Sequence, residues 1–186
     1  MHATTQESRF DQLFRQNQRA VLAYLHRRAD QDTALEAAAD TFLVAWRRIE
    51  EVPAGDDARL WLYGVARRML ANRRRSRERL QTLTTKLAGI RSEADPLPEA
   101  IVLRRAEDEE MLAAVSRLRP QDQELLRLAT WEELSRGEIA RILKTTPHAV
   151  RQRLYRITRR LARDLRVPAA ARDFRTTPLQ SGRKAR

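Results

Sequence analysis

Apolar residues recur along this chain at intervals of three and four residues, the pattern of helices with one buried face. Alternation typical of strands is scarce. The spacing predicts seven helices, over residues 10–28, 34–49, 58–80, 99–118 and 121–131 and as a pair within 135–163. We therefore expect an all-α protein.

The last two of these helices are predicted to form a helix-turn-helix. Ile139 and Leu143 give the first helix an apolar face, and Val150 and Ile157 do so for the second. Between them, the hydroxyl of Thr146 can cap the second helix, and Pro147 suits its first turn, where a missing N–H costs nothing. The second helix is too rich in arginine to be buried, so it is suited to phosphates and to the major groove of DNA.

Breaks in this pattern divide the chain into two small helical domains joined by a flexible linker. The first domain is predicted over residues 10–81 and the second, ending in the helix-turn-helix, over residues 99–166. The linker over residues 82–98 contains Gly89, Pro96 and Pro98. Residues 1–9 are expected to be a disordered N-terminus, and residues 167–186 a flexible basic tail.

Two finer features of the first domain follow from helix-end chemistry. Asp32 and Thr33 are candidates for the N-cap of the second helix. Residues 50–57 contain Pro53 and Gly55 and are predicted to form a loop.

The charge of the chain is strongly positive and unevenly distributed. The net charge is +12. Residues 59–80 hold eight Arg against one Glu, and residues 136–166 hold ten Lys or Arg against two acids, whereas residues 91–110 hold seven acids against three Arg. Two basic blocks separated by an acidic one indicate two nucleic-acid contacts. Solvated arginine-rich helix faces are the alternative explanation.

Several classes of site are excluded or disfavoured by composition. The chain has no Cys, and its three His, at positions 2, 26 and 148, make no metal-ligand pattern, so we expect neither a metal nor a cofactor. It has no glycine-rich phosphate loop and no His–carboxylate constellation, so we expect no enzyme. No apolar run is long enough to span a membrane, and no signal-peptide pattern begins the chain, so the expected location is cytoplasmic.

Three segments together resemble the extracytoplasmic-function (ECF) sigma factors of bacterial RNA polymerase, within the sigma-70 superfamily. Residues 36–47 resemble the helix that binds the polymerase clamp. Residues 60–67 and the arginines after them resemble the helix that melts and reads the minus-10 element. Residues 118–120, 134–140 and 150–156 resemble the region that reads the minus-35 element. The resemblance implies a dissociable polymerase subunit without catalytic residues that directs promoter-specific initiation.

The resemblance and the residue chemistry together nominate three sets of contacts. The minus-35 set is Lys144, His148, Arg151, Gln152, Arg153, Tyr155, Arg156, Arg159 and Arg160. The minus-10 set is Trp61, Tyr63, Arg67, Arg68, Asn72, Arg73, Arg74 and Arg75. The core polymerase set is Glu36, Asp40, Phe42, Leu43, Trp46 and Arg47.

Alternatives remain open for the aromatic members of these sets. Trp61 is better explained as a core residue than as a stacking surface for a base, and Tyr63 fits both explanations equally. Phe42 and Trp46 share a helix face and are at least as well explained by burial in their own domain.

Lys144 stands in the turn where the family usually has glycine. If Lys144 takes the left-handed conformation, it costs roughly 1 kcal/mol relative to glycine. A neighbouring phosphate would offset part of this cost.

The partners implied are the clamp and flap regions of core RNA polymerase, promoter DNA and, as is common in the family, an anti-sigma protein. No small-molecule substrate and no membrane insertion are expected. The main alternative is a conventional helix-turn-helix regulator that is not a polymerase subunit. A basic protein that binds nucleic acid without sequence preference is a third.

Overall fold

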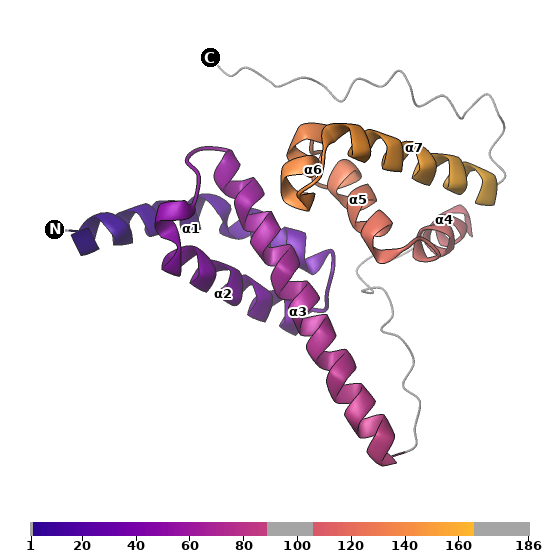
Figure 1. Cartoon of the computed structure of the whole chain (residues 1–186), viewed down its shortest axis with the longest axis horizontal. Coiled ribbons are helices and arrows are strands. Elements are labelled where there is room, and N and C mark those ends of the chain that lie inside the picture. The colour runs from indigo at the N-terminus through magenta and orange to yellow at the C-terminus, as the bar shows by residue number, and fades with distance from the viewer. Residues whose placement is uncertain (1, 89–105, 166–186) are drawn as a thin grey trace. The chain divides into compact units, whose positions relative to one another are not determined.

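The structure is a computed structural model that describes residues 2–88 and 106–165. These residues form seven α-helices and one short 3₁₀-helix, with no strand among them (Figure 1). The chain divides into two compact units, Met1–Ile101 and Val102–Arg186. The prediction of an all-α protein with two helical domains is confirmed.

The first unit is a three-helix bundle of α1 (His2–His26), α2 (Gln31–Arg47) and α3 (Asp57–Ala88), with the 3₁₀-helix η1 (Ile49–Glu51) between α2 and α3. Each of the three long helices packs against the other two. The periodic apolar residues meet in the core, where the largest fully buried side chains include Val21, Tyr24 and Leu25 of α1 and Leu62 and Val65 of α3.

The cap of α2 differs from the prediction. Asp30 is the N-cap residue, and its carboxylate accepts hydrogen bonds from the backbone N–H of Thr33 at 2.9 Å and from the Thr33 hydroxyl at 2.8 Å. Asp32 and Thr33 themselves lie inside the helix. The prediction was wrong because Thr33 is a polar residue whose role is to donate to the cap rather than to be the cap.

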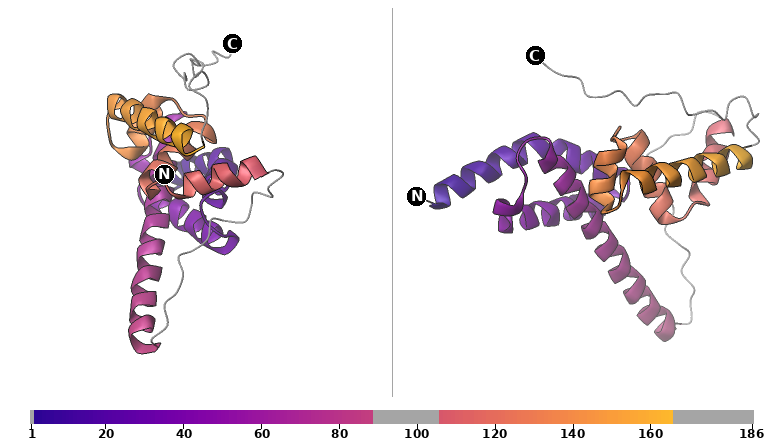
Figure 2. Two further views of the ribbon diagram at one scale, coloured as in Figure 1. Left: turned by 90° about the vertical axis from the view of Figure 1, so that its right-hand side faces the viewer. Right: turned by 45° about the horizontal axis from the view of Figure 1, so that its top comes forward.

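Two helices of the first unit are longer than predicted. α1 begins at His2, within the segment expected to be disordered, and Gln6 and Arg9 tie it to α2 and to the loop after η1. α3 continues to Ala88, into the expected linker, and its C-terminal part runs on past α1 and α2 (Figure 2). The segment from Asp57 to Ala88 contains no proline and one glycine, so nothing in it terminates a helix before Gly89.

The second unit contains α4 (Ala106–Ser116), α5 (Pro120–Thr130), α6 (Arg136–Leu143) and α7 (Pro147–Asp164). The other three helices all pack against α7. Leu125, Leu128, Ile139 and Val150 are buried where they meet. Residues 99–105 of the predicted fourth helix, residues 89–98 of the predicted linker and the predicted tail lie outside the described residues.

Candidate nucleic-acid interface

The helix-turn-helix is formed by α6 and α7, and local hydrogen bonds fix both of its helix starts. The hydroxyl of Thr146 accepts from the backbone N–H of Ala149 at 3.1 Å, and Pro147 is the first residue of α7. Both features were predicted. A further feature was not predicted: Ser135 and Glu138 form a reciprocal capping box at the start of α6. A Ser followed three residues later by Glu is the signal that would have found it.

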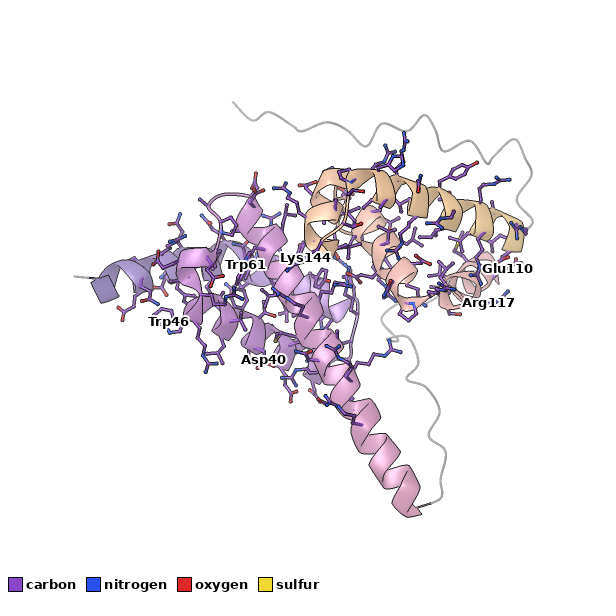
Figure 3. All side chains as sticks on the ribbon, in the orientation of Figure 1. Asp40, Trp46, Trp61, Glu110, Arg117 and Lys144 are labelled. Atoms are coloured by element: carbon purple, nitrogen blue, oxygen red, sulfur yellow. The ribbon has the colours of Figure 1, made fainter. Side chains whose placement is uncertain are left out.

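The turn between the two helices depends on Lys144. Its backbone is left-handed, with φ 52° and ψ 53°, and its N–H still bonds to the last turn of α6. Lys144 is exposed at the end of α6 (Figure 3). The conformational cost expected for a lysine at this position therefore applies.

The second helix of the helix-turn-helix, α7, has one buried and one exposed face. Val150, Ile157, Leu161 and Ala162 are buried against the other helices of the unit. The exposed side chains of the predicted minus-35 set are those of Lys144, His148, Arg151, Gln152, Tyr155, Arg156, Arg159 and Arg160. The Arg159 guanidinium carbon lies 5.7 Å from the centre of the Tyr155 ring, which orders two of these side chains.

Arg153 is the exception in the predicted minus-35 set. Its Nη2 and Nε both donate to Oδ1 of Asp122 on α5, at 2.7 and 3.2 Å. The two side chains are only 28% and 25% exposed. Arg153 therefore joins α7 to α5 and does not fit a role as a free DNA contact.

In the first unit, the two candidate aromatic residues of α3 are mostly internal. Tyr63 is 4% exposed and stacks on Tyr24 with 4.6 Å between ring centres. Trp61 is partly buried. The burial of Tyr63 does not fit a contact with an unpaired base, because its ring is already covered by another ring of the core.

The polar residues of the predicted minus-10 set on α3 fall into two groups. Arg68, Asn72, Arg74 and Arg75 are exposed, and Arg67 is partly buried. Arg73, by contrast, forms ion pairs with Glu36 and with Asp40 of α2, the latter at 2.6 Å. The hydrogen bond from Arg73 to Asp40 is the main cause that raises the pKa of Arg73 above its ordinary value. A predicted minus-10 residue is thus bound to two predicted polymerase contacts.

The loop expected over residues 50–57 is shorter in the structure, spanning residues 52–56 between η1 and α3, and α1 holds both the loop and η1. Arg9 donates through Nη2 to the carbonyl of Val52 at 2.8 Å and through Nη1 to the carboxylate of Glu50 at 3.2 Å. Gly55 takes a left-handed φ of 64°, which allows the chain to turn into α3. Nothing in the sequence pointed to Arg9, because its partners lie more than 40 residues away.

The predicted polymerase-binding helix α2 has an exposed side and an aromatic side. Glu36, Leu43 and Arg47 are exposed, although Glu36, like Asp40, is paired with Arg73. Phe42 is 7% exposed and packs edge-on against Phe14. Trp46 lies toward the end of the helix (Figure 3) and is partly buried. Its ring packs edge-on against that of Phe10, with 5.2 Å between the ring centres. The intramolecular explanation fits Phe42 better than a partner contact does.

Exposed apolar residues on α2 extend further than predicted. Leu35 is 47% exposed and Leu43 is 46% exposed, and the exposed Ala39 lies between them at helical spacing. Leu35 was not among the predicted contacts, although its spacing of eight residues from Leu43 would have indicated a shared face.

Two kinds of site are not found in the part of the chain that the structure describes. There is no group of three or more His, Cys, Asp or Glu that could hold a metal ion. No described helix is both long and apolar enough to cross a membrane.

The two units match two known family models. Residues 13–80 match the model for sigma-70 region 2, and residues 108–161 match the model for sigma-70 region 4. The matches coincide with the bundle of α1–α3 and with the unit that contains the helix-turn-helix.

Two bacterial sigma factors are similar to this chain in sequence. The ECF RNA polymerase sigma factor BldN of Streptomyces coelicolor is 34% identical over 83% of this chain, which spans 59% of BldN. The RNA polymerase sigma factor YlaC of Bacillus subtilis is 30% identical over 83% of this chain, which spans 91% of YlaC.

Solved structures share the fold. The sigma factor RpoE of Bartonella quintana, solved with the anti-sigma factor NepR, has a TM-score of 0.63 at 21% identity and covers 85% of this chain and 97% of its own. CnrH, solved with the cytosolic domain of CnrY, has a TM-score of 0.51 at 20% identity and covers 86% of this chain and 89% of its own. With its two matched regions in order and relatives at this identity, the chain belongs to the ECF sigma factors of the sigma-70 family.

Proposed function

We propose that this chain binds core RNA polymerase and directs promoter-specific transcription initiation by recognising the minus-35 and minus-10 elements. The observation that carries the proposal is the pairing of an exposed basic recognition helix, α7, with a second basic helix, α3, in a separate unit. A conventional regulator needs only one DNA-reading unit. The second one is expected only where two promoter elements are recognised.

The minus-35 contacts are assigned to the exposed face of α7. Arg151 and Gln152 lie in its N-terminal half, where recognition helices reach base edges. Arg156, Arg159 and Arg160 lie further along and are assigned to phosphates. Arg153 is assigned to the α5–α7 contact instead, because Asp122 already neutralises it.

The minus-10 contacts are assigned to α3 and to the loop over residues 50–57. The exposed Arg68, Asn72, Arg74 and Arg75 can follow the DNA backbone. Trp61 retains enough exposed surface to line the minus-10 site, whereas Tyr63 is buried and belongs to the core.

Core polymerase binding is assigned to the exposed side of α2. Leu35, Ala39 and Leu43 supply an apolar strip, and Glu36 and Arg47 supply charges beside it. Asp40 contributes through its contact with Arg73. The chain supplies binding energy for promoter opening and no catalytic group, and it works in the cytoplasm, where the polymerase is.

An anti-sigma protein is proposed as a further partner. The support is that RpoE, which shares the fold, was solved in complex with NepR. Co-expression of the chain with candidate proteins encoded beside it, followed by measurement of initiation, tests this. Undiminished initiation with every candidate would count against such a partner.

Run-off transcription tests the main proposal. Purified core polymerase is incubated with fragmented source genomic DNA, with and without the chain. New discrete start sites that share two upstream motifs are the expected result. Sequence-specific duplex binding by the chain alone, with no polymerase-dependent initiation, would instead identify a conventional regulator.

A further inference from the structure

His148 and Gln152 form a side-chain pair on the exposed face of α7. Nε2 of the His148 imidazole lies 2.8 Å from Nε2 of the Gln152 amide, and both side chains are exposed. Because α7 begins at Pro147, the pair occupies its first two turns. This is the part of a recognition helix that reaches base edges, so the hydrogen bond within the pair affects what the helix can offer to a base.

The contact requires one nitrogen to donate and the other to accept. The amide nitrogen of Gln152 carries two hydrogens and cannot accept, whereas Nε2 of a neutral imidazole accepts when the ring hydrogen is on Nδ1. Gln152 therefore donates to His148. One amide N–H and the carbonyl oxygen Oε1 of Gln152 remain free.

These two free groups match one base edge in the major groove. A glutamine reads adenine by donating from Nε2 to N7 and accepting at Oε1 from the N6 amino group. That contact requires the amide to present its oxygen and nitrogen in a fixed order. With the ring hydrogen on Nδ1, an amide turned over by half a rotation would present them in reverse order and place its oxygen against the lone pair of His148 Nε2.

We propose that His148 is a positioning residue that holds the Gln152 amide in the orientation that reads adenine in the minus-35 element. This rests on the proposed function of α7. The proposed role differs from a direct contact between His148 and DNA, because a positioning His148 acts only through Gln152. A His148 that contacted a phosphate would affect all sequences alike.

Selection from a randomised duplex library tests the proposal. The full chain in complex with core polymerase is used, and base preferences are read at every position of the minus-35 element. Gln152→Ala is expected to abolish the adenine preference at one position, which identifies the base that Gln152 reads. His148→Ala is expected to lower the preference at that same position by roughly fivefold, the lower end of a bidentate contact, and to leave the other positions unchanged.

The double variant separates positioning from independent effects. In the Gln152→Ala background, His148→Ala should change no base preference. His26→Ala, which removes an imidazole from the first unit, is the control and should leave the preferences intact. Alanine is a good helix former and His148 is exposed, so the variant should fold, as circular dichroism would verify.

Three outcomes would overturn the proposal. His148→Ala could weaken all sequences equally, it could relax a different position, or it could retain its effect in the absence of Gln152. Wild-type protein with no base preference at any position would refute the proposed function itself, so the two failures are distinguishable.

Discussion

At the scale of single residues, two of the described positions in the second unit carry backbone strain. Glu133 and Lys144 both have a φ of 52°, which costs a residue with a side chain about 1 kcal/mol. We expect Lys144→Gly to raise the free energy of unfolding by up to about 1 kcal/mol, less the entropy that glycine adds to the unfolded chain. Urea denaturation of the full chain measures this.

Glu133→Gly is the matched control for Lys144→Gly. It removes the same strain but takes away an acid outside the predicted DNA contacts. Both variants should be more stable than the parent chain, whereas only Lys144→Gly should weaken binding to DNA. A Lys144→Gly variant that was neither more stable nor weaker in DNA binding would contradict this explanation of the turn.

Asp30 gives a prediction about pH. Hydrogen bonds from the backbone N–H and then the hydroxyl of Thr33 hold the pKa of Asp30 below its ordinary value. Because the folded-state pKa is depressed, the stabilisation is fully present above the unfolded-state pKa of about 3.9 and is lost as pH falls through the folded-state value. Asp30→Asn keeps a capping side chain that does not titrate. Its stability should therefore approach that of the parent chain on acidification below about pH 4.

Urea denaturation at several pH values checks the behaviour of Asp30. Asp30→Ala, which removes the cap itself, should cost about 1 kcal/mol at neutral pH. A difference between the parent chain and Asp30→Asn that stayed constant down to about pH 3 would contradict the role of the charge.

At the scale of helices, the ion pair between Arg153 and Asp122 fixes α7 on α5. Both side chains are mostly buried, so Asp122→Asn should lower the free energy of unfolding by about 1–3 kcal/mol. It should also weaken duplex binding, because it loosens the recognition helix without touching DNA. Denaturation and fluorescence anisotropy with a minus-35 duplex measure the two effects.

Asp164→Asn is the control for Asp122→Asn. Asp164 pairs with Arg160 one turn earlier on the same helix at 3.8 Å. A pair of this kind contributes at most about 0.5 kcal/mol. Equal losses for the two variants would show that Arg153 is no more important than a surface cation.

The second helix-scale contact joins α3 to α2 through Arg73. Neutralising Asp40 as Asp40→Asn removes one of the two acids that hold Arg73, and Arg73→Gln removes the cation. Both variants should weaken binding to core polymerase by a similar factor, because Asp40 acts through its contact with Arg73. Both should also increase amide hydrogen exchange in the middle of α3.

Competition binding to core polymerase distinguishes this from a direct contact. Arg74→Gln, which removes a neighbouring exposed cation, is the control. If Asp40→Asn weakened polymerase binding and Arg73→Gln did not, Asp40 would contact the polymerase itself.

At the scale of the whole molecule, what the sequence predicted was local. The helices, the Thr146 cap and Pro147 depend on residues within a few positions of one another, so periodicity and cap chemistry found them. The contacts between helices that it missed join distant segments: Arg153 and Asp122 are 31 residues apart, and Arg73 and Asp40 are 33 apart. A run of cations shows how much positive charge a helix carries, not which cations another helix neutralises.

The same reason explains the aromatic residues. Tyr63 lies in a helix beside an arginine cluster, which made a base contact plausible, but its partner Tyr24 belongs to α1. Only packing of α1 on α3 determines that the two rings cover each other. The assignment of exposed faces therefore required the structure, whereas the existence of two basic units did not.

The last prediction concerns how much the C-terminal tail adds to the DNA affinity of these basic units. Residues 167–186 hold five Lys or Arg and one acid and extend past both matched regions. If the tail binds phosphates, its removal should make the dependence of log K on log salt shallower by about one unit for each phosphate that it neutralises, without changing base preference. Duplex binding at several salt concentrations measures this.

A second variant separates charge from chain length: it keeps the length of the tail and replaces its five cations with glutamine. Its salt slope should equal that of the truncated chain. An unchanged salt slope in both would eliminate a DNA role for the tail. The electrostatic attraction to promoter DNA would then come from the exposed arginines of α3 and α7. These two helices belong to the units that match sigma-70 regions 2 and 4.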